Sequence, residues 1–341
     1  MARIEVGTTG ITVERNGFGA LPIQRISEEE AVRLLRRARE GGMEWFDSAH
    51  AYSNSEEKLG AAFGGHWDGI FIATKTGATD VATFWDELHQ SLTRLKTDHI
   101  DLYQFHNPAF CPKPGGEDGL YDAMLEAQRQ GKVAHIGITN HRLDVAREAI
   151  DSGLYETLQF PFSYLATEKE TALVRRCEEQ NVGFIAMKAL SGGLIMNAAA
   201  ACAWIMQASP IVVPIWGIQR ERELDEFLHF IAEPLALTDE LEAVIEKDRA
   251  ELEGDFCRGC GYCMPCPQGI EISTCARASL MMRRAPKELT LGEDGQAKMR
   301  RVEECVECGK CAKKCPYGLD TPALLKRNYQ DFLEVLAGKP L

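Results

Sequence analysis

The chain has 341 residues, 45% hydrophobic and 26% charged, which is ordinary globular composition and enough for a barrel-sized domain with an appended module. Its net charge of −13 argues against a nucleic-acid-binding protein, which needs a basic surface to displace counterions from phosphates. The N-terminus has no basic end followed by an apolar core, so we read no secretory signal and expect a cytoplasmic protein. Polar residues and prolines interrupt the most membrane-like stretch, residues 194–216, so we expect a buried helix and strand there, not a membrane span.

Charge and cysteine are both unevenly distributed along the chain. From residue 251 onward there are 14 Lys and Arg against 13 Asp and Glu, whereas the first 250 residues carry 24 against 38. Nine of the twelve cysteines lie between Cys257 and Cys315. The composition therefore predicts two domains, residues 1–250 and residues 251–341, and we expect the second to end in a helix.

Short apolar runs alternate with helical patterns through the first domain. The runs predict strands at residues 16–20, 44–47, 70–75, 100–106, 134–140, 157–160, 182–188 and 211–217. Between them, Ser27 to Glu30 form a capping box, and residues 142–152 and 167–180 have apolar residues at helical spacing. Eight strands alternating with eight helices over about 250 residues predict an α/β fold, the closed (β/α)8 TIM barrel. A doubly wound open sheet is the alternative, but no glycine fingerprint for a dinucleotide follows the first strand.

Polar residues end four consecutive apolar runs. Asp47, Lys75, His106 and Asn140 follow one another at separations of 28, 31 and 34 residues, about one strand-helix unit each. The carboxyl ends of barrel strands meet at one face, where active sites are built. One such residue alone would more often be a helix cap or a satisfied core residue. The joint pattern predicts that the four side chains share one site.

These residues lie in motifs that resemble the aldo-keto reductase family over residues 1 to about 235. The motifs are WFDSAHAYSNSEEKLG (45–60), FIATK (71–75), DLYQFH (101–106) and GKVAHIGITNH (131–141). The resemblance implies a catalytic tetrad of Asp47, Tyr52, Lys75 and His106. A free tyrosine, with a pKa near ~10, is a poor acid at neutral pH. An ammonium such as Lys75 stabilises the phenolate, Asp47 would hold the lysine, and His106 would orient the substrate carbonyl. His106 favours reduction of a carbonyl group, because relatives that reduce the carbon-carbon double bonds of enones carry glutamate at this position.

The same resemblance implies a nicotinamide dinucleotide, NADP in preference to NAD. Thr139, Asn140 and Gln159 would bind the carboxamide, Met187 would cover the nicotinamide ring, and LSGG (190–193) would bind the pyrophosphate through backbone amides. Arg220 and Arg222 would grip a 2′-phosphate, with a solvated helix face as the alternative. The predicted cofactor-binding residues are Gly19, Ala20, Asp47, Thr139, Asn140, Gln159, Met187, Leu190, Ser191, Gly193, Gly217, Gln219, Arg220 and Glu226.

Two cysteine motifs dominate the second domain. CRGCGYCMPCP (257–267) and CVECGKCAKKCP (305–316) each hold four cysteines and end in Cys-Pro. Disulfides do not persist in a reducing compartment, and zinc ribbons separate two CxxC pairs by a dozen or more residues. CxxCxxCxxxCP is the bacterial-ferredoxin motif for a [4Fe-4S] cluster. The second group matches it fully, and the first is one residue short before its last cysteine. We therefore predict two clusters, with one cluster or zinc as the alternatives.

The ferredoxin resemblance implies that the fourth cysteine of each motif serves the other cluster. Cys257, Cys260 and Cys263 would then share a cluster with Cys315, and Cys305, Cys308 and Cys311 a cluster with Cys266. Cys275 lies outside both motifs and is predicted to be a core thiol, as are Cys177 and Cys202. The whole chain resembles a bacterial subset of aldo-keto reductases with a C-terminal ferredoxin-like domain.

Two functions from different classes follow. The tetrad predicts an NAD(P)H-dependent oxidoreductase that reduces a small-molecule aldehyde or ketone to an alcohol. The eight ferredoxin-type cysteines support the alternative, an iron-sulfur protein that exchanges electrons with a partner such as a ferredoxin. We expect no nucleic-acid or membrane partner in either case.

Overall fold

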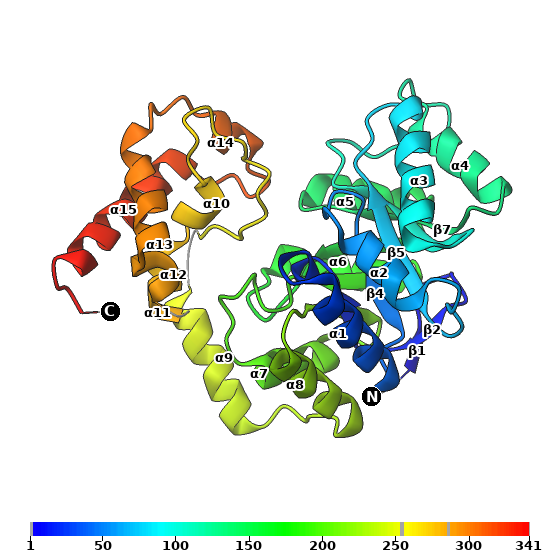
Figure 1. Ribbon diagram of the computed structural model, residues 1–341, viewed down its shortest axis with the longest axis horizontal. Helices are drawn as coiled ribbons and strands as arrows, with labels where there is room; N and C mark the ends of the chain where they lie inside the picture. Colours follow the sequence, from blue (N-terminus) through cyan, green and yellow to red (C-terminus); the bar gives the residue numbers. More distant parts are fainter. Residues whose placement is uncertain (1–2, 253–255, 285–286, 341) are drawn as a thin grey trace. The chain divides into compact units, whose positions relative to one another are not determined.

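A closed barrel of eight parallel strands forms the larger part of the computed structural model, which describes residues 3–252, 256–284 and 287–340 (Figure 1). Each strand pairs with the next along the chain, and the last pairs with the first. The barrel strands are β3 (Gly17–Gly19), β4 (Trp45–Asp47), β5 (Phe71–Thr76), β6 (Ile100–His106), β7 (Val133–Thr139), β8 (Thr157–Pro161), β9 (Gly183–Met187) and β10 (Val212–Gly217). The predicted TIM barrel is confirmed, and all eight strands lie within the predicted runs or overlap them.

One helix follows each barrel strand, and these helices surround the strands in Figure 1. They are α1 (Glu28–Glu40), α2 (Ser55–Phe63), α3 (Val81–Leu95), α4 (Leu120–Arg129), α5 (Leu143–Ser152), α6 (Glu168–Glu179), α7 (Ala198–Ala208) and α8 (Glu221–Ala232). The predicted capping box at Ser27 is present: its hydroxyl accepts a hydrogen bond from the Glu30 amide, and the Glu30 carboxylate accepts one from the Ser27 amide. Residues 194–216 contain α7 and all of β10 except Gly217, so the buried helix and strand predicted there are confirmed.

An N-terminal hairpin closes the amino end of the barrel. Its strands, β1 (Arg3–Glu5) and β2 (Thr12–Glu14), pair antiparallel. Val6 and Val13 are fully buried among inward-facing barrel residues such as Trp45. A methyl group at Gly183 would lie 2.6 Å from a Val6 methyl carbon, so only glycine lets the hairpin approach β9 this closely. With the amino end filled, the carboxyl ends of the strands are left for a site.

The described chain divides into two compact units. The first holds the barrel and comprises residues 3–189 and 199–242, and the second comprises residues 190–198 and 243–340. Residue 250, the predicted domain boundary, lies within α9 (Asp239–Glu251). Segment 190–198, which follows β9 in the chain, belongs to the second unit and not to the barrel.

The second unit is a set of short helices and loops around a small apolar core. Its helices after α9 are α10 (Ile272–Cys275), α11 (Ala278–Arg284), α12 (Glu288–Leu291), α13 (Glu293–Arg300), α14 (Lys310–Lys314) and α15 (Thr321–Leu336). Ile272, Met282 and Phe332 are almost fully buried in this core, together with Cys275. Cys275 is therefore the core thiol that the sequence predicts, and Cys177 and Cys202 are likewise buried. Among all described residues, no helix is both long and apolar enough to cross a membrane.

Candidate functional site

Lys75 and Asp47 form a buried ion pair at the carboxyl ends of β5 and β4. The Lys75 ammonium lies 2.6 Å from Asp47 Oδ1 and donates a second hydrogen bond to the Ser48 carbonyl at 2.5 Å. Burial lowers the pKa of Lys75 and raises the pKa of Asp47, and the attraction between the two groups opposes both shifts. Each charged group therefore depends on the other to remain ionised in the barrel interior.

Tyr52 and His106 lie beside this pair. The Lys75 ammonium is 5.4 Å from the centroid of the Tyr52 ring, and the Tyr52 and His106 rings meet edge to face at 5.7 Å. Burial, followed by the repulsion from Lys75, lowers the pKa of His106 to about 3. His106 is thus a neutral imidazole at physiological pH, able to donate or accept a hydrogen bond without carrying charge. The structure brings together Asp47, Tyr52, Lys75 and His106.

Two further buried polar side chains surround this group, and sequence reasoning gave them no role. Glu56, on α2, accepts a hydrogen bond from the Thr74 hydroxyl at 2.6 Å and attracts Lys75, which raises the lysine pKa against the effect of burial. His141 is 3% exposed, and burial, with Lys188 and His106 nearby, holds its pKa well below the ordinary value. Both residues lie in the motifs quoted above, but their types alone do not distinguish them from capping or core residues.

The predicted carboxamide-binding residues differ in how their polar atoms are used. Gln159 donates a hydrogen bond to Asp47 at 3.4 Å, and its Oε1 is buried with no hydrogen-bond partner among the described residues. The Asn140 amide donates to the Pro108 carbonyl at 2.9 Å and accepts from the His141 and Arg142 amides. Gln159 therefore has an unused acceptor that fits an amide donor, while Asn140 holds the turn between β7 and α5.

Thr139 and Met187 also contact each other, the Thr139 hydroxyl lying 3.9 Å from the Met187 sulfur. Gly19 and Ala20 lie at and just after the end of β3, and the Ala20 amide donates to the Asp47 carbonyl at 2.8 Å. Gln159 and Ala20 thus contact Asp47, and Thr139 lies opposite His106 in the pairing of β7 with β6, beside the tetrad.

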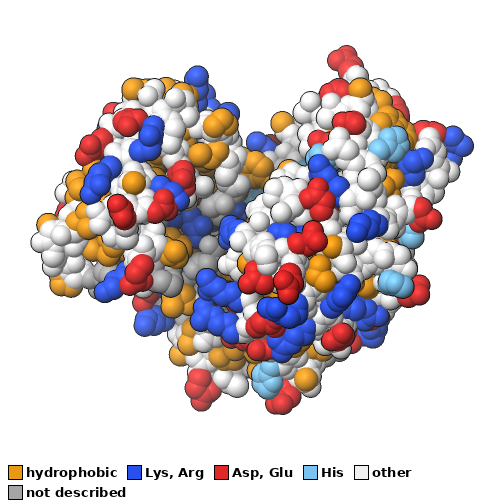
Figure 2. Space-filling view, viewed as in Figure 1, with side chains coloured by type: hydrophobic (Ala, Val, Ile, Leu, Met, Phe, Trp, Pro, Cys, Tyr) orange, Lys and Arg blue, Asp and Glu red, His pale blue; other side chains and the backbone are white. Residues whose placement is uncertain are grey.

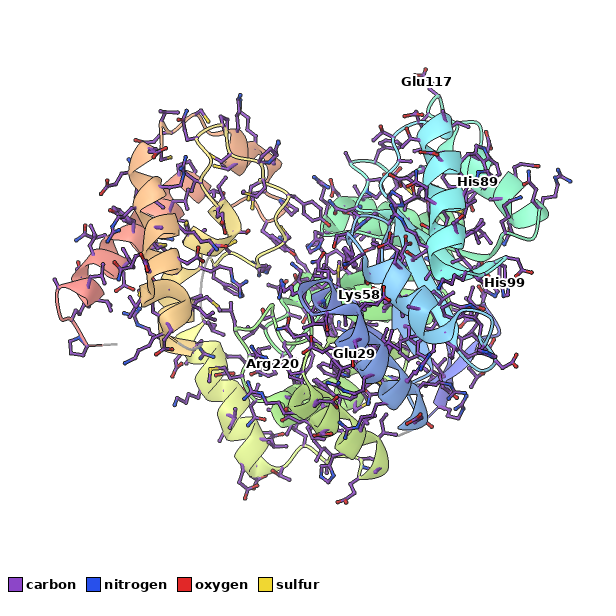
Figure 3. The ribbon with its side chains drawn as sticks, viewed as in Figure 1. Glu29, Lys58, His89, His99, Glu117 and Arg220 are labelled. Atoms are coloured by element: carbon purple, nitrogen blue, oxygen red, sulfur yellow. The ribbon has the colours of Figure 1, made fainter. Side chains whose placement is uncertain are left out.

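The start of α8 carries the residues predicted to meet the adenosine phosphate. Arg220, labelled in Figure 3, is the N-cap residue of α8 and lies 3.7 Å from Glu223. The Glu223 carboxylate accepts hydrogen bonds from the amides of Gln219 and Arg220, at 3.0 and 3.1 Å. An acidic side chain therefore already uses the amides at this helix N-terminus.

Ion pairs join α8 to α1, and charged side chains of both signs cover the two helices in Figure 2. Arg33 bonds Glu221 at 2.9 Å, and Arg37 contacts both Glu221 and Asp225. Glu226 lies on the same helix, and burial raises its pKa. These side chains are half-buried or exposed, so we read the network as a solvated face that orients α8.

Segment 190–193 makes a tight turn. Ser191, Gly192 and Gly193 all have positive φ, and the Gly193 amide donates to the Leu190 carbonyl at 2.9 Å. Glycine adopts this backbone conformation without strain. Such turns present backbone amides to one side, which is the arrangement that binds phosphate groups elsewhere. Leu190, Ser191 and Gly193 belong to the second unit, whereas the other predicted cofactor residues belong to the first.

The eight motif cysteines line two separate cavities in the second unit. One cavity is lined by Cys257, Cys260, Cys263 and Cys315. The other is lined by Cys266, Cys305, Cys308 and Cys311, with Cys263 also reaching it. Apolar residues such as Ile272 line both cavities, together with charged residues such as Arg258 in the first and Lys310 in the second. The thiols are thus grouped as two sets of four, with the last cysteine of each motif in the set of the other.

Both cavities have an all-sulfur donor set. Among the described residues, no three His, Cys, Asp or Glu side chains converge closely enough to hold one metal ion. A [4Fe-4S] cube spreads its four thiolates farther apart than a single tetrahedral ion does. Four thiols spread around one cavity fit such a cluster.

Comparisons with protein families match both parts of the chain. The model of the aldo/keto reductase family matches residues 6–199, more than half of the chain. The model of the 4Fe-4S dicluster domain matches residues 256–320, the region of both cysteine motifs.

Curated relatives align with 38% to 63% of the chain. An uncharacterized oxidoreductase from Schizosaccharomyces pombe is 26% identical over 63% of this chain and 81% of its own length. The aldo-keto reductase YhdN from Bacillus subtilis is 28% identical over 57% of this chain and 64% of its own. The methylglyoxal reductase DkgA from Escherichia coli O157:H7 is 32% identical over 38% of this chain and 48% of its own. The chain thus spans about half to four fifths of the length of these relatives.

Solved structures of aldo-keto reductases share the barrel. The holo form of one from Bacillus halodurans has a TM-score of 0.64 at 21% identity, covering 73% of this chain and 96% of its own. A thermostable one in complex with epalrestat has a TM-score of 0.60 at 24% identity, covering 73% and 100%. At these identities the likeness shows the fold. With the family match over most of the barrel and the second match over the cysteines, the chain belongs to the aldo-keto reductase family and carries a C-terminal 4Fe-4S dicluster domain.

Proposed function

We propose that this protein reduces an aldehyde or ketone to an alcohol with NADPH, or NADH, as hydride donor. The observation that supports the proposal most directly is the grouping of Tyr52 and His106 around the buried Lys75–Asp47 pair. A carbonyl reduction needs a proton at oxygen and a hydride at carbon, and this group of residues suits the proton transfer. The named activity of one relative, a methylglyoxal reductase, is reduction of a small carbonyl compound.

Tyr52 donates the proton in this proposal. Its hydroxyl hydrogen passes to the carbonyl oxygen, and the phenolate that remains is stabilised by the Lys75 ammonium until it takes a proton from solvent. Asp47 and the Ser48 carbonyl hold that ammonium in place. The neutral His106 imidazole donates a hydrogen bond to the same carbonyl oxygen and orients the substrate. The bound reduced nicotinamide supplies the hydride.

Gln159 is the residue that best fits the nicotinamide carboxamide, because its buried Oε1 has no hydrogen-bond partner among the described residues. Thr139 completes the carboxamide site, Asn140 supports it by holding the turn that follows β7, and Met187 covers the ring. The turn at Leu190, Ser191 and Gly193 receives the pyrophosphate. Gly217, Gln219, Arg220 and Glu226 border the adenosine end, with Gly19 and Ala20 at the reacting end. Arg220 favours NADPH, and the neighbouring Glu223 carboxylate limits that preference.

We further propose two [4Fe-4S] clusters, one held by Cys257, Cys260, Cys263 and Cys315 and the other by Cys266, Cys305, Cys308 and Cys311. The two cavities and their all-sulfur donor sets support this assignment. Since these ligands must remain thiolates, we propose the cytoplasm as the compartment. We keep residues 1–250 as the reductase domain and residues 251–341, with the C-terminal helix, as the cluster domain.

Replacement of Tyr52 tests the reductase proposal. Tyr52→Phe is expected to lower kcat for an aldehyde substrate about 10²-fold or more while NADPH binding is retained. Tyr121→Phe is the matched control: it also removes one hydroxyl, which donates to the Leu154 carbonyl, outside the tetrad. Full turnover by Tyr52→Phe would overturn the assignment of the proton donor.

The two cysteine sets support a second function, one-electron exchange with a partner such as a ferredoxin. A nicotinamide passes two electrons as hydride, whereas each cluster passes one at a time. Anaerobic protein with both clusters would be mixed with NADPH or with reduced ferredoxin, and cluster reduction followed by electron paramagnetic resonance. Reduction by either donor supports this function, and unchanged carbonyl turnover in folded, cluster-free protein counts against a role in catalysis.

A further inference from the structure

Arg277 joins two segments of the second unit that lie 85 positions apart in the chain. Its Nη2 donates a hydrogen bond to the Gly192 carbonyl at 2.6 Å. Nearby along the same segment, Arg284 Nη1 donates to the Leu194 carbonyl at 3.0 Å, and Arg284 Nη2 pairs with Asp248 at 2.9 Å. Two guanidinium groups therefore hold the Gly192 and Leu194 carbonyls of segment 190–198 against the cluster domain.

The same Arg277 guanidinium lies against the first cysteine motif. A methyl group at Gly259 would lie 2.4 Å from Arg277 Nη1, so the arginine packs directly on the backbone of this turn. The Gly259 amide in turn donates to Cys257 Sγ at 3.4 Å. Arg277 thus contacts the turn that orients a predicted cluster ligand.

One buried N–H group of the Arg277 guanidinium, at Nε, has no acceptor among the described residues. Buried N–H groups are normally paired, and a cluster bound through Cys257, which interacts electrostatically with Arg277, would offer sulfur acceptors and negative charge nearby. N–H donors around a cluster also shift its reduction potential. The position of Arg277, which contacts both the Gly259 turn and the Gly192 carbonyl, therefore fits a role shared between the first cysteine motif and segment 190–198.

We propose that Arg277 couples the redox state of the cluster held by Cys257, Cys260, Cys263 and Cys315 to dinucleotide binding at segment 190–198. The inference rests on the proposed function, in which this segment receives the pyrophosphate. Reduction by an external one-electron donor adds one negative charge to the cluster. That negative charge attracts the Arg277 guanidinium, which also holds the Gly192 carbonyl. The reduced protein therefore binds an anionic dinucleotide more weakly. Linkage is reciprocal, so the bound dinucleotide makes the cluster harder to reduce.

Calorimetry on the full chain with both clusters tests this coupling. The probes are ADP-ribose and its 2′-phosphate, which carry the pyrophosphate but no nicotinamide and so cannot exchange electrons with the clusters. Their Kd would be measured anaerobically on oxidised protein and on protein photoreduced with deazaflavin. We expect the Kd of the reduced protein to be higher by about fivefold or more, the low end of measured allosteric couplings.

Arg277→Met and Arg283→Met form a matched pair of variants. Each removes one guanidinium, at positions six residues apart. Arg283 pairs with Asp331, 2.6 Å away, and contacts neither segment 190–198 nor a cysteine motif in any hydrogen bond of the described chain. Arg277→Met is expected to have the same Kd in both redox states, whereas Arg283→Met keeps the difference. Iron and sulfide analysis establishes first that each variant retains both clusters. If Arg277→Met loses iron, Arg277→Lys, which keeps the charge without the planar fork, is expected to lose the redox dependence.

The outcomes separate the inference from the function on which it rests. If oxidised wild-type protein binds neither probe, the dinucleotide proposal itself fails. If it binds them with equal Kd in both redox states, or more tightly when reduced, the coupling is overturned. A redox dependence that persists in both Arg277→Met and Arg277→Lys would also overturn the role of this residue. Comparison of the two probes reports separately on the 2′-phosphate.

Discussion

The Lys75 ammonium lies 2.6 Å from Asp47 Oδ1, and the two side chains are only 1% and 3% exposed. An ion pair this deep is costly to form, and removing one partner leaves an uncompensated buried charge. A pair kept for stability alone could be replaced by apolar residues of similar volume. Its retention beside Tyr52 fits a chemical role, since the ammonium faces a phenol ring 5.4 Å away.

Breaking this pair is expected to impair both activity and stability. Lys75→Met should lower kcat about 10²- to 10⁴-fold and destabilise the barrel by about 3–5 kcal/mol. The double variant Asp47→Asn/Lys75→Met removes both charges, so it should recover stability but not activity. Steady-state kinetics and chemical denaturation would measure the two effects. A double variant as unstable as the single one would argue that packing, not the stranded carboxylate, causes the loss.

The pH dependence of the reaction should show no contribution from His106. Because its pKa in the folded protein is about 3, the imidazole stays neutral from pH 5 to pH 9. His106→Asn should lower kcat about 10²-fold, through loss of the hydrogen-bond donor, without moving any inflection of the pH profile. Profiles of kcat against pH for both proteins check this. An inflection that disappears in the variant would contradict the neutral assignment.

The lowered pKa of His106 also affects the stability of the folded protein. The folded pKa of His106 is lower than the unfolded value near ~6.5, so between these values the unfolded chain binds one more proton. His106 therefore makes the protein less stable as the pH falls from about 6.5 toward 3. Denaturation midpoints at pH 5 and pH 7 should differ less in His106→Asn than in the wild type. Equal pH dependence in both would show that other groups dominate.

Coenzyme preference should respond to Glu223. Its carboxylate accepts hydrogen bonds from the Gln219 and Arg220 amides, where a 2′-phosphate would compete with it. Glu223→Gln should shift the ratio of kcat/KM for NADPH over NADH by about fivefold toward NADPH, the effect of one charge near a helix N-terminus. Glu233→Gln, which removes an equal charge beyond the other end of α8, is the control. An equal shift in both variants would indicate a long-range charge effect.

The iron content of cysteine variants should show which cysteines bind the same cluster. Cys257→Ala and Cys315→Ala should disturb the same cluster and leave the other spectroscopically intact, because both cysteines line one cavity. Cys308→Ala should disturb the second cluster instead. Cys275→Ser, a change in a buried core thiol, should retain both. Iron and sulfide analysis with electron paramagnetic resonance would distinguish these patterns. Loss of the second cluster alone in Cys315→Ala would reverse the pairing between the motifs.

Much of the barrel and of its candidate site could be predicted from the sequence. Apolar runs spaced by one strand-helix unit imply parallel strands, and strand-end residues such as Asp47 and Lys75 must then meet at one face. The cysteine motifs are similarly local, since their spacing alone suits a cluster. These features depend on residue type and short-range order, which the sequence records directly.

Other features depend on contacts between distant parts of the chain. The sequence by itself determined the closed barrel, the four strand-end side chains and the two sets of cysteines. Only the tertiary structure decided three other contacts. The Asn140 side-chain amide hydrogen-bonds the Pro108 carbonyl, and the Glu223 carboxylate accepts hydrogen bonds from two backbone amides of a predicted phosphate site. Arg277 donates a hydrogen bond to the Gly192 carbonyl. The physical reason is that a polar side chain takes whichever buried donor or acceptor the fold brings within about 3 Å, and residue spacing does not specify that partner.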